Sequence, residues 1–299
     1  MKKYLHYLLL LSLIMIVQKV NAQLKLDEPI LVSVQYEFVH VNDLNHRDLP
    51  IREMMMLQTG QTLSKYRKAS YPKSRSSGNP PRPKTVQQKG NPNLGTAMAV
   101  VFGPGFTTEE LFQFPNENKI SILETKGNYD YQVDISLPKI NWKIYEETRE
   151  IGIYTCQKAI GEFSGRTYVA WFAPELPFKN GPWKLSGLPG LILEAKDTKD
   201  EVLFLFKSCT KQVAGAKITT SKENLIKVSE KAYGRLKSAF DENPVVALRA
   251  QFSNTGDRNF EVAYRDATGL FVSGEEAEEL VARDKKLAKM RKNNPIELK

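Results

Sequence analysis

Two cysteines are the most reactive side chains in this sequence. Cys156 and Cys209 each lie in a strand-like run, Tyr154–Lys158 and Phe204–Cys209. In an oxidising compartment an even pair favours a disulfide, if neighbouring antiparallel strands bring the sulfurs together. Two free thiols buried in separate strands would give the same pattern. A nucleophile is a third alternative, because Lys158 could share the strand face of Cys156 and lower its pKa.

Other groups able to act on a substrate or hold a metal are few. His40, Asp43 and His46 are spaced like ordinary strand-end and turn residues more than like a zinc site. Glu175 and Asp197 are two carboxylates that could work as acid and base. Neither a Gly-x-Ser-x-Gly elbow nor a phosphate-binding glycine loop occurs. We therefore assign no catalytic residue, no metal ligand and no cofactor.

One segment, residues 171–194, is both stiff and apolar. Seven Pro or Gly residues lie between Pro174 and Gly190. A loop of this length is usually polar, so this composition predicts an ordered, packed loop. It either plugs one end of a sheet or lines an apolar pocket. The candidate binding residues are Trp171, Phe178, Trp183, Leu188, Pro189 and Gly190.

The end of this loop has the composition of a tight turn. Pro189 and Gly190 suit the two central positions of a type II turn, where Pro presets φ and Gly accepts a positive φ. Gly187 is expected to permit a close approach of the backbone just before it.

Alternation of apolar and polar residues predicts a β-rich body. The pattern begins at Val32, resumes at 54–57 and recurs in seven further runs, at 120–125, 129–136, 140–147, 150–160, 163–173, 190–196 and 201–208. Short intervals favour hairpins, and hence an antiparallel sheet. Helices are expected at about 221–240, capped by Ser221, and at about 274–292. The predicted class is α+β: a curved, half-barrel-like antiparallel sheet with C-terminal helices.

A basic stretch interrupts this pattern. Between Lys65 and Lys89 there are eight Lys or Arg and no Asp or Glu. Such a stretch cannot bury enough apolar surface to offset its ordering entropy, which predicts a mobile insertion at 65–93. A solvated loop is the first interpretation, and contact of Lys65 to Lys89 with an anionic surface is the alternative.

The N-terminus has the pattern of a cleavable secretory signal. Lys2 and Lys3 precede an apolar run of about ten residues, and Val20-Asn21-Ala22 suits signal peptidase, so we expect cleavage after Ala22. The run is short for a membrane span, which needs about 20 residues. We expect a single mature domain, 23–299, without an integral membrane anchor, in the periplasm or secreted. Its net charge falls from +9 to +6 without Lys2, Lys3 and Lys19, and no nucleic acid is expected as partner.

The hexapeptide Gly187-Leu188-Pro189-Gly190-Leu191-Ile192 resembles the signature of the GLPGLI family of Bacteroidota. The similarity extends over the mature chain, through Tyr36–Phe38, Ser64–Tyr66, Tyr154–Ala159, Gly165-Arg166, Ala170–Phe172, Gly181–Trp183 and Asn294–Leu298. The basic insertion looks longer than the corresponding connection in the family. The resemblance implies an exported β-rich protein in a Gram-negative envelope, and it implies no reaction.

These patterns favour a non-enzymatic role: binding or carrying an apolar or peptide ligand, or binding a membrane-protein partner. A structural partner of an outer-membrane complex and a hydrolase or peptidase are the alternatives. An open apolar cavity between the sheet and residues 174–190 would favour ligand binding. A filled interior would favour a scaffold.

Overall fold

The computed structural model describes residues 26–69, 97–102, 109–127, 129–211, 215–220, 222, 224–253, 260–265, 271–273, 275–291 and 293–298. The predicted signal peptide and most of the basic insertion therefore lie outside the described residues.

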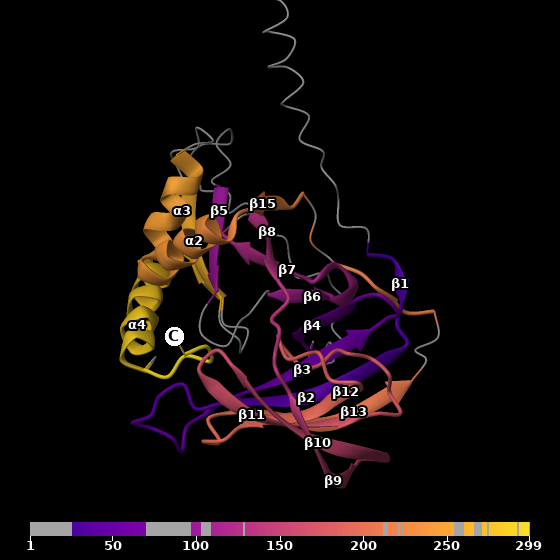
Figure 1. Cartoon of the computed structure of the whole chain (residues 1–299). Coiled ribbons are helices and arrows are strands. Elements are labelled where there is room, and N and C mark those ends of the chain that lie inside the picture. The colour runs from indigo at the N-terminus through magenta and orange to yellow at the C-terminus, as the bar shows by residue number, and fades with distance from the viewer. Residues whose placement is uncertain are drawn as a thin grey trace, which may run out of the picture.

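One large sheet dominates the structure (Figure 1). Its 12 strands follow the order β15 (Ile226–Val228), β8 (Tyr129–Ser136), β7 (Lys119–Lys126), β6 (Glu110–Phe114), β4 (Ser64–Lys68), β3 (Ile51–Thr59), β2 (Val32–His40), β13 (Val202–Lys211), β12 (Leu191–Asp197), β11 (Arg166–Ala173), β10 (Tyr154–Phe163) and β9 (Lys143–Ile151). All neighbours are antiparallel except β15 and β8. The edge strands β15 and β9 do not pair with each other, so the sheet stays open.

Strong curvature follows from the way these strands pair. The pairing register shifts between β9 and β10, between β11 and β12 and between β13 and β2, and an extra residue at such a point bends the strand that carries it. In Figure 1 the strands β9 to β13 with β2 and β3 form the lower part of the sheet, and β4, β6, β7 and β8 turn upward. The predicted α+β fold with a curved, half-barrel-like antiparallel sheet and C-terminal helices is confirmed.

Smaller elements complete the fold. β1 (Glu28–Pro29) pairs with β14 (Lys217–Ile218), and β5 (Ala97–Phe102) pairs with β16 (Phe260–Arg265), which also pairs with β17 (Phe271–Ser273). A short 3₁₀ helix, Pro115–Glu117, joins β6 to β7.

Three helices stand together beside the sheet: α2 (Glu230–Glu242), α3 (Pro244–Ser253) and α4 (Glu275–Arg291) (Figure 1). Gln251 of α3 donates to the carbonyl of Lys126 at 3.2 Å, at the end of β7. No helix among the described residues has both the length and the apolar character needed to cross a bilayer.

The first C-terminal helix begins later than its sequence predicts. Residues 226–228 pair in parallel with β8, so they are extended, and the helix begins at Glu230 instead of near 221. Ser229 is its N-cap, because its side chain accepts from the N–H of Ala232 at 3.3 Å. The second predicted helix, at 274–292, corresponds to α4.

The start predicted for the basic insertion is also wrong. Lys65 lies inside β4 with only 5% of its surface exposed. Its ammonium donates at 2.7 Å to a Glu110 carboxylate oxygen and at 2.7 Å to the carbonyl of Thr219. These partners offset the cost of burying the charge, so Lys65 is not available to an anionic surface.

Candidate functional site

The apolar loop between β11 and β12 is ordered by its own backbone. Gly187 donates to the carbonyl of Lys179 at 2.8 Å. Leu191 donates to the carbonyl of Leu176 at 2.9 Å, which closes the loop where β12 begins. The loop therefore has a defined shape, as its Pro and Gly content predicts.

Buried side chains fix this loop to the sheet. Asn180 donates to Ser64 Oγ at 2.9 Å and to Gln113 Oε1 at 3.1 Å. Gln113 in turn donates to the carbonyl of Trp183 at 2.7 Å, and Tyr36 donates to the carbonyl of Ile192 at 2.7 Å. Four polar residues from three strands and the loop thus hold Trp183 against the sheet.

Two glycines have the reverse of their predicted roles. Gly187 has φ +97° and an open surrounding, so it supplies the unusual backbone conformation. Gly190 does not have a positive φ, which makes the predicted type II turn at Pro189 and Gly190 wrong. A Cβ at Gly190 would lie 2.3 Å from the carbonyl oxygen of Ala173, so this glycine permits the close approach.

A cavity of about 240 Å³ lies between the sheet and the loop. It is lined by Phe38, His40, Glu53, Met55, Tyr66, Arg67, Glu109, Trp183, Phe204 and Ile296. Strand register explains its floor: Phe204 of β13 lies opposite Phe38 of β2, which lies opposite Glu53 of β3. Side chains at directly paired positions share a face, so β13 and β2 present two aromatic rings to the cavity and β3 presents the carboxylate of Glu53 beside them.

Three aromatic rings shape the cavity wall. Phe38 and Phe204 stack with their centroids 5.2 Å apart, and Trp183 stacks on Phe204 at 6.4 Å. Phe163 meets Trp183 edge-on at 5.4 Å. Trp183 has φ +55°, a conformation that costs a non-glycine residue about 1–3 kcal/mol and persists only where its surroundings enforce it.

Of the six candidate loop residues, only Trp183 lines the cavity. Leu188 is buried in the core, and Trp171 is buried on β11 under the guanidinium of Arg149, 4.2 Å from the ring centroid. Phe178 is half-buried and Pro189 is exposed. Most of the loop therefore packs into the core, as expected of a plug at the end of the sheet. Trp183 alone among the six candidates lines a pocket, as the second alternative expects.

The C-terminal strap, residues 293–298, forms another wall through Ile296. Arg166 of β11, which is 4% exposed, holds the strap. Its Nε donates to the carbonyl of Ile296 at 3.0 Å, and its Nη2 donates to Asn294 Oδ1 at 2.6 Å and the carbonyl of Pro295 at 2.9 Å. Its Nη1 donates to Asp197 at 2.6 Å and Glu201 at 2.9 Å. All five N–H donors of the guanidinium are therefore used.

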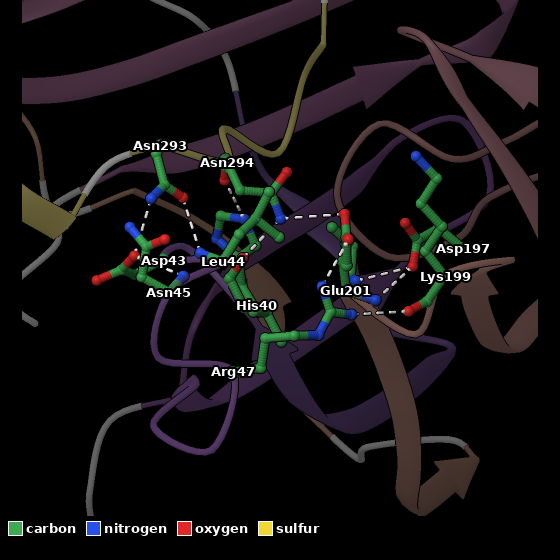
Figure 2. Close-up of polar contacts among 12 residues, drawn as sticks. His40, Asp43, Leu44, Asn45, Arg47, Asp197, Lys199, Glu201, Asn293 and Asn294 are labelled. Atoms are coloured by element: carbon green, nitrogen blue, oxygen red, sulfur yellow. Dashed lines mark hydrogen bonds and ion pairs between the residues drawn. The ribbon is translucent and has the colours of Figure 1, made fainter.

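His40 connects this network to the cavity (Figure 2). Its Nε2 lies 2.8 Å from the carbonyl oxygen of Asn294, and a carbonyl only accepts, so Nε2 carries the proton. Asn294 also donates to the carbonyl of Val41 at 2.7 Å and to Glu201 at 3.1 Å, and Arg47 donates to Glu201 at 3.0 Å. Burial is the main cause that lowers the pKa of His40, which favours the neutral imidazole.

Both cysteines are free in the structure, so the alternative of a disulfide is not realised. β11 and β12 lie between β10, which carries Cys156, and β13, which carries Cys209. Burial raises the pKa of Cys156 to about 12, and Lys158 pairs with Glu147 at 2.6 Å. A protonated, buried thiol is a poor nucleophile, so the third alternative is not supported either.

The other candidate groups serve as structural partners. Asp197 accepts from Arg166 and from the N–H groups of Glu201 and Val202, so it is not positioned as an acid or base, and Glu175 is exposed. Asp43 accepts from His46 Nδ1 at 2.7 Å. Within the described ranges, no three His, Cys, Asp or Glu side chains form a group that could hold a metal ion.

Sequence reasoning missed most of the cavity. The sequence pattern predicts that Phe38 and Phe204 are core residues of strands. It assigns Tyr66 to the basic insertion at 65–93. Arg166 and Asn294 belong to two separate parts of the family resemblance, Gly165-Arg166 and Asn294–Leu298. The structure joins these two distant segments in one hydrogen-bond network, and their place in the resemblance is the signal that the sequence offers for them.

Comparisons with known proteins add a family model and a distant likeness. The model described as a protein of unknown function (Porph_ging) matches residues 164–194, which include the hexapeptide 187–192. No curated protein matches the chain. Two crystal structures of PNGF-II, in different space groups, are similar with a TM-score of 0.46 and 15% identity. Each match covers 69% of this chain and 32% of PNGF-II, so the chain spans about a third of that protein.

We predict that Gly190→Ala lowers the free energy of unfolding by about 2–3 kcal/mol, because the added methyl meets backbone atoms that cannot move aside. Gly234→Ala is the matched control: nothing lies within 4 Å of its Cβ position, on the exposed side of α2. We expect it to stabilise by about 0.5–1 kcal/mol. Urea unfolding measures both. A Gly190→Ala variant as stable as the wild type would refute the tight approach.

We predict that stability declines from about pH 8 to about pH 5.5 because of His40. Its folded pKa is lowered by burial, so the unfolded chain takes up a proton first as the pH falls below the ordinary value of 6.5. His40→Gln keeps a donor for Asn294 but cannot titrate, so the decline becomes smaller. His46→Gln, which removes an exposed imidazole, should retain the decline. Urea unfolding at the two pH values is the measurement, and an equal decline in His40→Gln would contradict this assignment.

Proposed function

We propose that this protein binds a small apolar group, of the size of one aromatic ring, in the cavity between its curved sheet and the loop 174–190. The cavity lined by Phe38, Phe204 and Trp183 is the observation that supports the proposal. Rings at such separations favour a flat apolar guest, because stacked and edge-on contacts add to the area that is buried. The group can belong to a free molecule or to a peptide.

The cavity volume supports a small guest. Pockets that enclose a drug-sized ligand hold about 300–1,000 Å³, and this cavity of about 240 Å³ is smaller. An apolar cavity of about 150 Å³ is enough to bind benzene. One ring therefore fits, whereas a larger ligand would leave most of its surface outside.

Ligand binding is favoured over the two alternative functions, a structural scaffold and a hydrolase or peptidase. A scaffold protein needs no cavity, and a filled interior would have favoured that role. A hydrolase finds some support, because His40, Glu53 and Glu109 share the cavity lining and burial raises the pKa of Glu109. The Nε2 proton of His40 is donated to Asn294, Glu53 pairs with Lys68 at 2.9 Å, and neither Ser nor Cys lines the cavity. This arrangement lacks an activated nucleophile.

The same proposal places the protein in the envelope. The n-region and apolar run at residues 1–22 support export, and the match over 164–194 together with the hexapeptide supports a place in the GLPGLI family. In this setting we propose that the protein carries its ligand in the periplasm or outside the cell, or presents the cavity to a peptide of an envelope protein.

We predict that toluene raises the melting temperature of the wild type, because it binds only the folded protein. Ile296→Trp should abolish the shift, since a larger side chain in the strap fills the cavity without altering the sheet. Differential scanning calorimetry with and without saturating toluene is the measurement.

Glu297→Trp is the matched control for this experiment. Glu297 is the exposed neighbour of Ile296 and does not line the cavity, so the same side chain is added to the same strap outside it. We expect this variant to keep the toluene shift. The proposal would be refuted if toluene shifted none of the three proteins, or shifted Ile296→Trp as much as the wild type.

We predict that the protein purified from its native cells begins at Gln23, because Val20 and Ala22 satisfy the small-residue requirement of signal peptidase. Edman sequencing or intact mass measures this. Recovery of the chain with residues 1–22 still attached would contradict export by cleavage.

A further inference from the structure

Tyr66, one of the residues that line the cavity, carries an unpaired hydroxyl. The side chain projects from β4 and only 5% of its surface is exposed. Its hydroxyl oxygen is shielded from solvent and has no hydrogen-bond partner. Leaving a buried hydroxyl unpaired is costly, so native proteins rarely tolerate one without a reason.

The location of Tyr66 sets it apart from similar groups. Four other buried polar atoms lack a partner in the part of the chain that the structure describes, in Thr59, Tyr168, Ser186 and Gln251. None of these residues lines the cavity, and Tyr66 does. The nearby Tyr36, whose ring meets that of Tyr66 edge-on at 6.5 Å, has its hydroxyl bonded to the carbonyl of Ile192. Among the unpaired groups of the described residues, the Tyr66 hydroxyl is therefore the one that belongs to a residue lining the cavity.

The charges around the cavity favour a neutral polar group on that ligand. Glu53, Glu109 and Arg67 all line it, so both signs are present. Glu53 already pairs with Lys68 at 2.9 Å, and Arg67 donates to the carbonyl of Lys68 at 2.9 Å. A charged ligand would therefore lose its hydration and meet groups that are already engaged. Burial raises the pKa of Tyr66 well above its ordinary range, so its neutral hydroxyl can both donate and accept.

We propose that the cavity binds a phenol, with the ring among Phe38, Phe204 and Trp183 and the ring hydroxyl hydrogen-bonded to the hydroxyl of Tyr66. This inference rests on the proposed function, and it specifies the chemical class of the ligand. A phenol supplies a flat apolar body of the right size and a neutral group that donates and accepts. Tyr66 is then the residue that discriminates a phenol from a plain ring.

The test compares two probes that differ by one hydroxyl, p-cresol and toluene, by isothermal titration calorimetry. Tyr66→Phe removes the proposed partner. We expect the affinity for p-cresol relative to toluene to fall about tenfold in this variant. Tyr36→Phe is the matched control: it removes a hydroxyl that is already paired inside the protein, so the relative affinity should stay at the wild-type value.

The outcomes separate this inference from the proposed function. If toluene and p-cresol both fail to bind the wild type, the proposed function fails. If both bind and Tyr66→Phe leaves their ratio unchanged, the phenol inference is overturned and the proposed function stands. The unliganded Tyr66→Phe protein should also melt at a higher temperature than the wild type, because an unpaired buried group is removed. A lower melting temperature would show that the hydroxyl has a partner, which also overturns the inference.

Two sources of phenol remain to be distinguished, a free molecule and a tyrosine side chain of a peptide. N-acetyl-tyrosinamide carries the same ring with peptide groups attached. Binding of this compound, weakened by Tyr66→Phe as p-cresol is, indicates a peptide ligand. Binding of p-cresol alone indicates a free phenol, because the cavity then excludes the attached backbone.

Discussion

The arrangement around Arg166 is the interaction on which the rest of the site depends. A buried guanidinium is costly unless every donor is paired, and here its five donors are met by acceptors from β12, the turn after it and the C-terminal strap. Two carboxylates, one amide and two backbone carbonyls share the pairing. This network sets the position of the strap together with the N–H groups of Asn294 and Leu298, which donate to the carbonyls of Asn42 and Ser164 at 3.2 and 2.9 Å. Ile296 and the orientation of His40 follow from that position, and both line the cavity.

The opposite wall is fixed by a different constraint, the stiffness of the loop 174–190. Its backbone conformation at Trp183 is unfavourable by itself, and hydrogen bonds from Gln113 and within the loop enforce it. Side chains around a hollow of this kind usually close on it, because close packing is favourable. Two rigid walls on a curved sheet prevent that here. The space between them is a consequence of how the loop and the strap are held.

The alternation of residues predicted most of the sheet because it is a local signal. The ends of the expected strands agree with β7, β8, β12 and β13 to within a few residues. The same pattern does not predict β4 and β6, because a charged residue normally indicates an exposed position. Here Lys65 and Glu110 are buried as a pair. The sequence predicts the helix from Ser221, and the structure begins it at Glu230, because the parallel pairing of residues 226–228 with β8 is not local. Long-range pairing decided each of these cases.

The site was harder to predict than the fold for a related reason. Composition identified an apolar loop but could not separate the ring that lines a cavity from those that fill the core, since both are large and apolar. Tyr36 and Tyr66 make the difficulty plain. Both are buried on the same face and their rings touch, yet one hydroxyl is paired within the protein and the other is not. Because that difference depends on the distant Ile192 carbonyl, no local pattern can contain it. A single hydrogen bond to a residue far away in the sequence therefore distinguishes two tyrosines that share one face of the sheet.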